Sequence, residues 1–176
     1  VLCNEGNLVP RDGEWSWRGD PTDVALLTFG KKLGWDRDDT LETHPQIDET
    51  PFEPERRYAA SYHRDADKTR VFVKGAPERV LEMCSEVPNG EFARPELHQQ
   101  AAGLAQEGYR ILAIAEGTVD TEAEPGGPTA DPTGLTFLGF LGLIDPLRSG
   151  VTEAISAAQD AGITVTMITG DHPETA

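Results

Sequence analysis

The stretch of the sequence that most constrains the fold is Val71 to Leu81, which reads VFVKGAPERVL. Its three apolar residues predict a buried strand, and Pro77 predicts a helix start, where the missing N–H of proline costs nothing. Lys74 and Gly75 lie between the strand and the helix. Glycine lets a ligand approach the backbone and a helix N-terminus favours an anion, so this joint predicts a phosphate held by Lys74. An ordinary surface lysine is the alternative, because short motifs also match by chance.

The composition is that of a globular protein with an unusual charge. The 176 residues are 38% hydrophobic and 26% charged, enough for one substantial domain or for one domain and part of another. The 15 basic and 31 acidic residues give a net charge of −16. Because so negative a surface repels nucleic acid and anionic lipid, we expect neither as a partner.

Many of the basic residues are clustered in the sequence. Those within residues 56–79 are Arg56, Arg57, Arg64, Lys68, Arg70, Lys74 and Arg79. A local basic cluster in an acidic chain predicts a discrete site for a small anion. The alternative is that these residues line the solvent edge of a hairpin.

Neither a disulfide framework nor a metal site is expected. Cys3 and Cys84 are few and far apart, which favours free thiols in a reducing compartment, and the histidines have no ligand spacing. The longest apolar run, residues 135–144, has about half the length needed to cross a bilayer. The chain starts at Val1 and stops within what reads as the first turn of a helix, so we expect it to belong to a larger protein.

Helix and strand signals both occur along most of the chain. Asp20 as N-cap, Pro21 as first helical residue and Gly34 as terminator predict a helix over residues 20–34. Asp23 stands three residues after the cap, as in a capping box. The other expected elements are a hairpin at 11–19, a hairpin of strands 58–63 and 70–74, helices 76–84 and 95–108, and strands 109–115 and 135–144.

One of these strands and the segment that follows it carry further structural signals. Alternation along residues 109–115 places Arg110 and Leu112 on one face of a strand. Residues 118–134 are rich in Pro, Gly, Thr and acid and predict a mobile surface loop.

The pattern changes near residues 143–147. A helix over 148–161 and a strand over 163–168 follow, in the order typical of a parallel α/β sheet. We therefore expect two domains, residues 1–142 and residues 143–176.

Six motifs connect these signals to a known family. They are GDPTDVALL (19–27), PFEPERRY (51–58), KGAPERVLEMC (74–84), GYRILAIA (108–115), LIDPLR (143–148) and TGDHPETA (169–176). In sequence and in order they resemble the ion-pumping P-type ATPases, most closely the type II group of calcium, sodium–potassium and related bacterial cation pumps. The resemblance extends essentially over the whole chain.

The resemblance implies both a fold and a domain organisation. Residues 1–142 are similar to the nucleotide-binding domain of these pumps, an α+β domain in which helices flank a twisted antiparallel sheet. Residues 143–176 are similar to a hinge and a partial phosphorylation domain, a short α/β piece of the haloacid-dehalogenase type.

Site residues are implied motif by motif. The implied ATP-binding residues are Asp23, Phe52, Arg57, Lys74, Gly75, Arg110 and Leu112. Phe52 would stack on the adenine, Asp23 would lie near the adenine amino group, and Arg110 would lie near the phosphates. A flat adenine stacked on one aromatic ring gains about 1–3 kcal/mol, by analogy with base stacking. Lysine and arginine suit the phosphates as a point charge and a fork of donors.

The C-terminal motifs imply two further sets of residues. Thr169 and Gly170 would hold the transferred phosphoryl group, with Asp171 supporting that loop. Asp145 and Arg148 would belong to the hinge between the domains.

The chain departs from the family pattern at several positions. Asp23 and Arg57 stand where Glu and Lys are usual, Glu53 and Pro54 follow Phe52 where a Ser is frequent, and Leu147 replaces a second proline. The shorter Asp23 could reach the adenine through water. Leu147 could make the hinge less stiff.

The motifs that carry the chemistry of these pumps are absent. Neither DKTGT, with its phosphorylated aspartate, nor GDGxND occurs, so no catalytic residue is expected in this fragment. The resemblance implies an ATP-binding domain on the cytoplasmic side of a cation pump, in a bacterial plasma membrane. The expected cofactors are ATP and, in the full-length enzyme, Mg²⁺ with ligands mostly outside this fragment. The expected partners are the remaining phosphorylation, actuator and transmembrane domains of the same chain, and no metal site or direct membrane insertion is expected here.

Two other functions are compatible with parts of the sequence. One is a free-standing nucleotide-sensing module without transport. The other is a cap fragment of a soluble haloacid-dehalogenase-type phosphatase, which would need a DxD loop that the chain lacks.

Overall fold

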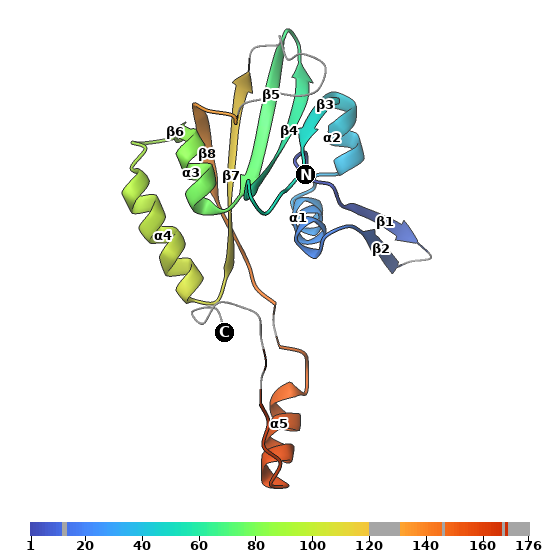
Figure 1. Cartoon of the computed structure of the whole chain (residues 1–176). Coiled ribbons are helices and arrows are strands. Elements are labelled where there is room, and N and C mark those ends of the chain that lie inside the picture. Colours follow the sequence, from blue (N-terminus) through green and yellow to red (C-terminus); the bar gives the residue numbers. More distant parts are fainter. Residues whose placement is uncertain (12–13, 120–130, 146, 167, 169–176) are drawn as a thin grey trace.

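The structure is a computed structural model that describes residues 1–11, 14–119, 131–145, 147–166 and 168. Within these residues it has an α+β fold with one large sheet and one small one. Figure 1 shows helices α3 and α4 beside the large sheet, α1 and α2 at its other side, and α5 beyond one end of the sheet.

The large sheet is mostly antiparallel, with strand order β3-β4-β5-β7-β8-β6. Its strands are β3 (Gln46–Thr50), β4 (Tyr58–Asp65), β5 (Lys68–Gly75), β6 (Cys84–Glu86), β7 (Arg110–Val119) and β8 (Leu135–Leu143). Only the β6–β8 pair among these is parallel. The predicted antiparallel sheet is therefore confirmed, and it contains the predicted hairpin β4–β5.

The hydrophobic core lies on one face of this sheet. Strand alternation brings inward-facing side chains together from the four central strands: Tyr58, Ala60, Tyr62, Val71, Val73, Ala113, Ala115, Leu135 and Phe137. The helix α3 (Pro77–Met83) covers them with Val80, Leu81 and Met83, and α4 (Arg94–Gln106) packs beside it. The residues between those of the core, including Lys74, belong to the opposite face of the sheet.

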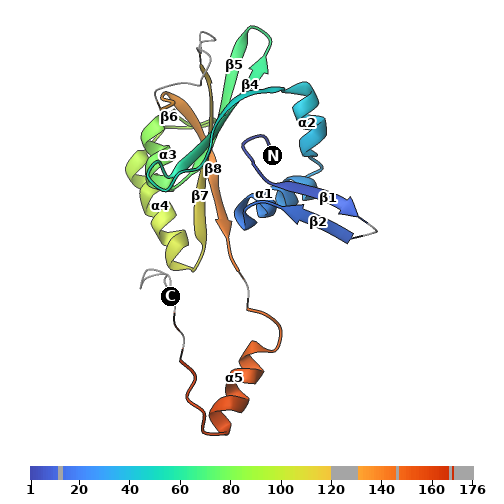
Figure 2. The ribbon, with the colours of Figure 1, turned by 45° about the vertical axis from the view of Figure 1, so that its right-hand side comes forward.

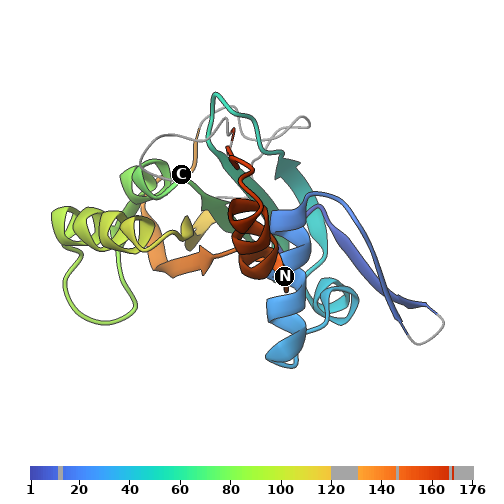
Figure 3. The same ribbon diagram turned by 90° about the horizontal axis from the view of Figure 1, so that it is seen from below.

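That opposite face is where the N-terminal elements lie. They are β1 (Asn7–Arg11), β2 (Glu14–Arg18), α1 (Pro21–Lys32) and α2 (Arg37–Thr43). The β1–β2 pair is a separate two-stranded sheet that projects away from the large sheet beside α1 (Figure 2). Seen from below, this hairpin and α4 lie at opposite sides of the molecule (Figure 3).

The helix α1 begins and ends as the sequence predicts. The side chain of Asp20 accepts a hydrogen bond from the Thr22 N–H, Pro21 is the first helical residue, and Gly34 follows the helix with a φ of +84°. Only glycine adopts such a φ without strain, so Gly34 ends the helix.

Beyond the large sheet, α5 (Val151–Asp160) has no buried residue. The predicted strand at 163–168 is wrong, because residues 163–166 and 168 have no strand conformation. A parallel strand needs neighbouring strands, and the described residues provide none beside this segment.

Other strands also differ from the prediction. The hairpin expected at residues 11–19 begins earlier, because β1 starts at Asn7. Strands β3 and β6 were not predicted. Strand β3 is a polar strand at one edge of the sheet, and β6 has only three residues. Strand β7 continues to Val119, into the segment predicted as a loop at 118–134. Most of that predicted loop lies outside the described residues.

Candidate functional site

A cavity of about 470 Å³ opens between α1, β5, β7 and the loop of residues 51–57. Its lining residues are Glu5, Asp20, Thr22, Asp23, Phe52, Arg57, Lys74, Gly75, Ala76, Arg110, Ile111 and Leu112. All seven residues predicted to bind ATP are among them. Segments far apart in the sequence therefore meet at one hollow.

Lys74 lies on the wall of this cavity near the end of β5. Its side chain leaves the sheet on the face opposite the core and meets Asp23 of α1, with which it forms an ion pair. Lys74 is 9% exposed and Asp23 is 7% exposed, so the pair is buried. A buried ammonium needs such a partner, because moving an unpaired charge out of water costs on the order of several kcal/mol.

The N-terminal segment holds Asp23 in place. One oxygen of its carboxylate, Oδ1, meets Lys74, and the other, Oδ2, accepts a hydrogen bond from the Glu5 N–H at 3.1 Å. The Asn4 side chain donates to the backbone oxygen of Asp23 at 2.9 Å and accepts from the Gly6 N–H at 2.8 Å. The predicted capping-box role of Asp23 is therefore replaced by a role in the wall of the cavity.

Gly75 is required by a close approach of two backbone segments. A Cβ atom at Gly75 would lie 2.5 Å from the Arg57 carbonyl oxygen and 2.7 Å from the Tyr58 Cα. The same Arg57 oxygen accepts a hydrogen bond from the Ala76 N–H at 2.9 Å. The end of β5 and the start of β4 thus touch at the cavity wall, which no larger residue would permit.

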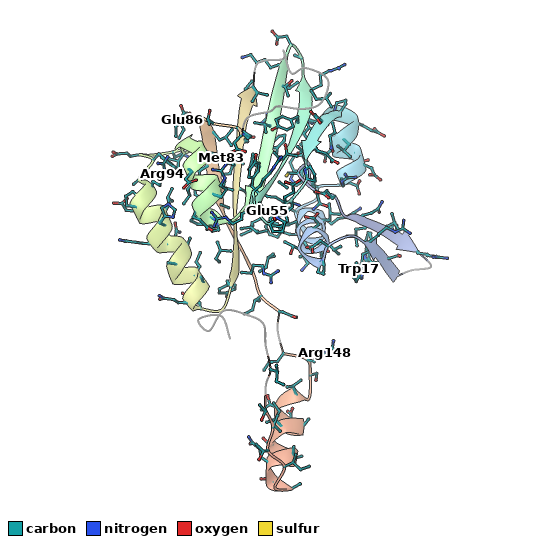
Figure 4. All side chains as sticks on the ribbon, viewed as in Figure 1. Trp17, Glu55, Met83, Glu86, Arg94 and Arg148 are labelled. Carbon is teal, nitrogen blue, oxygen red and sulfur yellow. The ribbon has the colours of Figure 1, made fainter. Side chains whose placement is uncertain are left out.

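Phe52 lies on the exposed loop of residues 51–57. Its side chain is 56% exposed although it is a large aromatic residue, and it lines the cavity. The loop ends in a turn in which the Glu53 oxygen accepts hydrogen bonds from the N–H groups of Arg56 and Arg57. Figure 4 places Glu55, of the same loop, between α1 and α3. An exposed ring at a hollow is available to stack on a flat ligand.

Arg57 closes this loop with a left-handed backbone, at a φ of 60°. Its guanidinium Nη1 donates to Glu78 Oε1 of α3 at 2.7 Å. Non-glycine residues with such a φ are uncommon and are enriched at functional sites.

Strand β7 completes the wall. The register pairs Lys74 with Ile114, and alternation from Ile114 places Leu112 and Arg110 on the same face as Lys74. Arg110 is exposed at the start of the strand, whereas Leu112 is half-buried. Ile111 also contributes to the lining.

The cavity combines charges of both signs with apolar surface. Glu5, Asp20 and Asp23 are its acids, and Arg57, Lys74 and Arg110 are its bases. Hydrogen bonds from Thr22 lower the pKa of Asp20 and so favour its ionised form. Such a site suits a ligand with a flat ring, hydrogen-bond donors and an anionic group.

The thiol of Cys3 lies next to the buried ion pair. Burial raises its pKa to about 11, and the nearby charge of Lys74 opposes that rise. The Cys3 thiol donates to the Ala59 oxygen at 3.5 Å. Its high pKa makes it a poor nucleophile at neutral pH.

Other predicted site residues do not belong to this cavity. Asp145 and Arg148 are exposed, and Figure 4 places Arg148 near α5, away from the sheet. Thr169, Gly170 and Asp171 lie outside the described residues.

The basic cluster of the sequence is only partly a ligand site. Of its members, Arg57 and Lys74 line the cavity. Arg56, Arg70 and Arg79 form ion pairs with carboxylates elsewhere. The hairpin-edge alternative describes Arg64, Lys68 and Arg70, which lie on the hairpin β4–β5, but not Arg56 or Arg79.

Sequence reasoning missed Glu5, Asp20, Thr22, Ala76 and Ile111 as lining residues. The first three flank Asp23 in the fold, and the motif GDPTD was the one available signal for Asp20 and Thr22.

Two features are absent from the described residues. They contain no group of three or more His, Cys, Asp or Glu side chains suited to hold a metal ion. Among them there is also no helix with the length and apolarity needed to span a membrane.

Comparisons with known proteins agree on one family. The family described as P-type ATPase, cytoplasmic domain N, matches residues 1–150. The chain is 38% identical over 181 aligned residues to the cation-transporting ATPase pma1 of Synechocystis, covering 100% of this chain and 20% of that protein. It is 35% identical to a calcium-transporting ATPase of Bacillus subtilis, covering 100% of this chain and 21% of that protein. It is 36% identical to the sodium/potassium exporting P-type ATPase cta3 of Schizosaccharomyces pombe, covering 100% of this chain and 18% of that protein. The chain thus spans about a fifth of the length of these relatives.

Proposed function

Since this chain belongs to the P-type cation ATPases and is their nucleotide-binding N domain, we propose that the cavity around Lys74 binds ATP for phosphorylation of an aspartate outside this chain. The observation that carries the proposal is the convergence of all seven predicted ATP-binding residues on one cavity. The volume of about 470 Å³ is within the range of small-molecule sites.

Each wall has its own role in this proposal. Phe52 stacks on the adenine and Leu112 packs beside it. Asp23, reaching the adenine amino group directly or through water, and its partner Lys74 form the buried polar wall. Arg57 and Arg110 are exposed and are available to the phosphates. Gly75 allows the ligand to approach the backbone.

The chemical step needs groups that this chain does not provide. Phosphoryl transfer depends mostly on positioning and on neutralising charge, and Arg57, Lys74 and Arg110 supply part of that charge. Mg²⁺ would accompany the ATP phosphates and neutralise charge there. We assign it no ligand among the described residues. We further propose that breakdown of the aspartyl phosphate drives cation transport across a bacterial plasma membrane.

Residues 143–176 would form the hinge and the start of the phosphorylation domain. Supporting this, Leu147 is 77% exposed and Ile168 is 94% exposed, and α5 has no buried residue. Apolar side chains so exposed favour burial against further protein. In this proposal Asp145 and Arg148 belong to the hinge, and Thr169, Gly170 and Asp171 hold the transferred phosphoryl group.

The proposal is tested in a full-length pump that carries this domain. Lys74→Met should abolish aspartyl phosphate formation from ATP and preserve its formation from inorganic phosphate, which needs no nucleotide pocket. Glu91→Gln, an exposed change outside the cavity, is the matched control. Unchanged phosphorylation of the Lys74→Met variant by ATP would refute the proposal.

A further inference from the structure

We propose that Glu78 is a positioning residue, which orients the Arg57 guanidinium so that its free edge faces the phosphates of the nucleotide. The inference rests on the proposed function of the cavity. Glu78 does not line the cavity itself, so it would act through Arg57.

The first support is the loop that carries Arg57. Residues 51–57 are all exposed, so core packing does not fix this segment. Two contacts tie its end to the start of α3: the Arg57 oxygen accepts from the Ala76 N–H at 2.9 Å, and Arg57 Nη1 donates to Glu78 Oε1 at 2.7 Å. The first contact fixes the Arg57 backbone and the second fixes its side chain.

The second support is the backbone of Arg57. Its φ of 60° lies in the left-handed region, and the hydrogen bond from the Ala76 N–H to the Arg57 oxygen constrains this backbone. A strained backbone pinned by its neighbours fixes the direction in which the side chain leaves. Glu78 then selects one rotamer of a long side chain that would otherwise be free to move.

The third support is the geometry of the guanidinium group. Arginine has five N–H donors in a rigid fork, and the Glu78 contact engages Nη1. The remaining donors can bind phosphate oxygens at the same time. A guanidinium held in place loses less conformational freedom on binding, which increases affinity.

The ion pair contributes little to folding. The Arg57 and Glu78 side chains are 53% and 50% exposed, and pairs that exposed contribute little to stability. Replacement of Glu78 should therefore leave the domain folded.

The test measures ATP and adenosine binding to the 176-residue chain by calorimetry, with its fold checked by circular dichroism. Glu78→Gln should weaken ATP binding about fivefold, the order expected when one long side chain is no longer held in place before binding, and leave adenosine binding unchanged. Glu82→Gln is the control, because it removes the same charge from the same helix. Glu82 pairs with Arg79 and not with Arg57. This control variant should bind ATP as the unchanged chain does.

The double variant Arg57→Ala/Glu78→Gln separates positioning from a general effect of charge. If Glu78 acts through Arg57, the double variant should bind ATP as Arg57→Ala alone does. ATP binding by Glu78→Gln that equals or exceeds that of the unchanged chain would overturn the inference, as would full additivity in the double variant. Failure of the unchanged chain to bind ATP would instead contradict the proposed function.

Discussion

Lys74 in β5 and Asp23 in α1 form a buried ion pair across 51 residues of sequence. The pair joins the N-terminal helix to the face of the sheet opposite the core, and both residues line the cavity. It thus connects the stability of the domain with the formation of its ligand site.

Removal of one partner of this pair should be strongly destabilising. Asp23→Asn leaves the Lys74 ammonium buried without a counter-charge, which costs about 3–5 kcal/mol. Urea unfolding measures this change, with the exposed Glu91→Gln as control. If Asp23→Asn lowers the free energy of unfolding no more than Glu91→Gln does, solvent must reach the Lys74 ammonium.

Replacement of both partners should separate stability from binding. The double variant Asp23→Leu/Lys74→Met fills the space with apolar groups, and such exchanges of buried pairs are often neutral or stabilising. We expect it to recover most of the stability lost by Asp23→Asn and still to bind ATP poorly. Recovery of ATP binding together with stability would contradict a direct role of the pair in the site.

Phe52→Ala should affect binding far more than folding. Because the ring is 56% exposed, its removal should change the free energy of unfolding by about 0.5 kcal/mol or less. Loss of stacking should weaken ATP binding by about 1–3 kcal/mol, and Phe52→Trp should retain it. Equal ATP affinities of the Ala variant and the unchanged chain would rule out stacking on this ring.

Gly75→Ala should destabilise the domain although the change is small. The new methyl group would lie 2.5 Å from the Arg57 oxygen, so the contact between β4 and β5 must shift, at a cost of about 1–3 kcal/mol. Gly103→Ala is the matched control, since nothing lies within 4 Å of its added Cβ in α4. That helical exchange should stabilise the chain by about 0.5–1 kcal/mol. Thermal unfolding of the two variants should therefore shift in opposite directions.

His63 should make stability depend on pH. Its side chain is 0% exposed, and Nδ1–H donates to the His44 oxygen at 2.9 Å while Nε2 lies 2.9 Å from the Ser61 hydroxyl. Burial lowers its pKa below the usual 6.5, so the unfolded chain binds a proton more tightly. This contribution to stability is complete above pH 6.5 and is lost as the pH falls through the lower folded pKa.

The variant His63→Gln tests this dependence. Between pH 7 and about pH 5, it should lose less stability to acid than the unchanged chain. His98→Gln, on α4, is the control and should keep the original slope. Parallel curves for all three proteins would show that His63 is not the group responsible.

Local sequence signals predicted the regular elements well. Asp20, Pro21 and Gly34 delimit α1 because their effects act through the backbone within a few residues. The hairpin β4–β5 could also be predicted, because its two strands are neighbours in the sequence. The edge strand β3 was missed because Ile47 and its polar neighbours have no continuous apolar face, and pairing with β4 alone makes it a strand.

Long-range contacts could not be predicted from spacing alone. In the sequence, the position of Asp23 is explained by a capping box alone. Its ion pair with Lys74 depends on how the chain folds. Seven of the cavity residues were assigned from family motifs, whereas Glu5 has no motif and lines the cavity because its backbone N–H is hydrogen-bonded to Asp23 of α1. The strand expected at 163–168 was wrong for a related reason. An apolar stretch becomes a strand only beside another strand, and the described residues supply none there.

The most direct test of the account is a titration of this chain with ATP and GTP, followed by heteronuclear NMR. Our account predicts chemical-shift changes clustered at Asp23, Phe52, Lys74 and Arg110, a preference for ATP, and loss of binding in Phe52→Ala and Lys74→Ala. The absence of any shift at millimolar ATP in a folded protein would contradict it, because the cavity would then not be a nucleotide site in this chain.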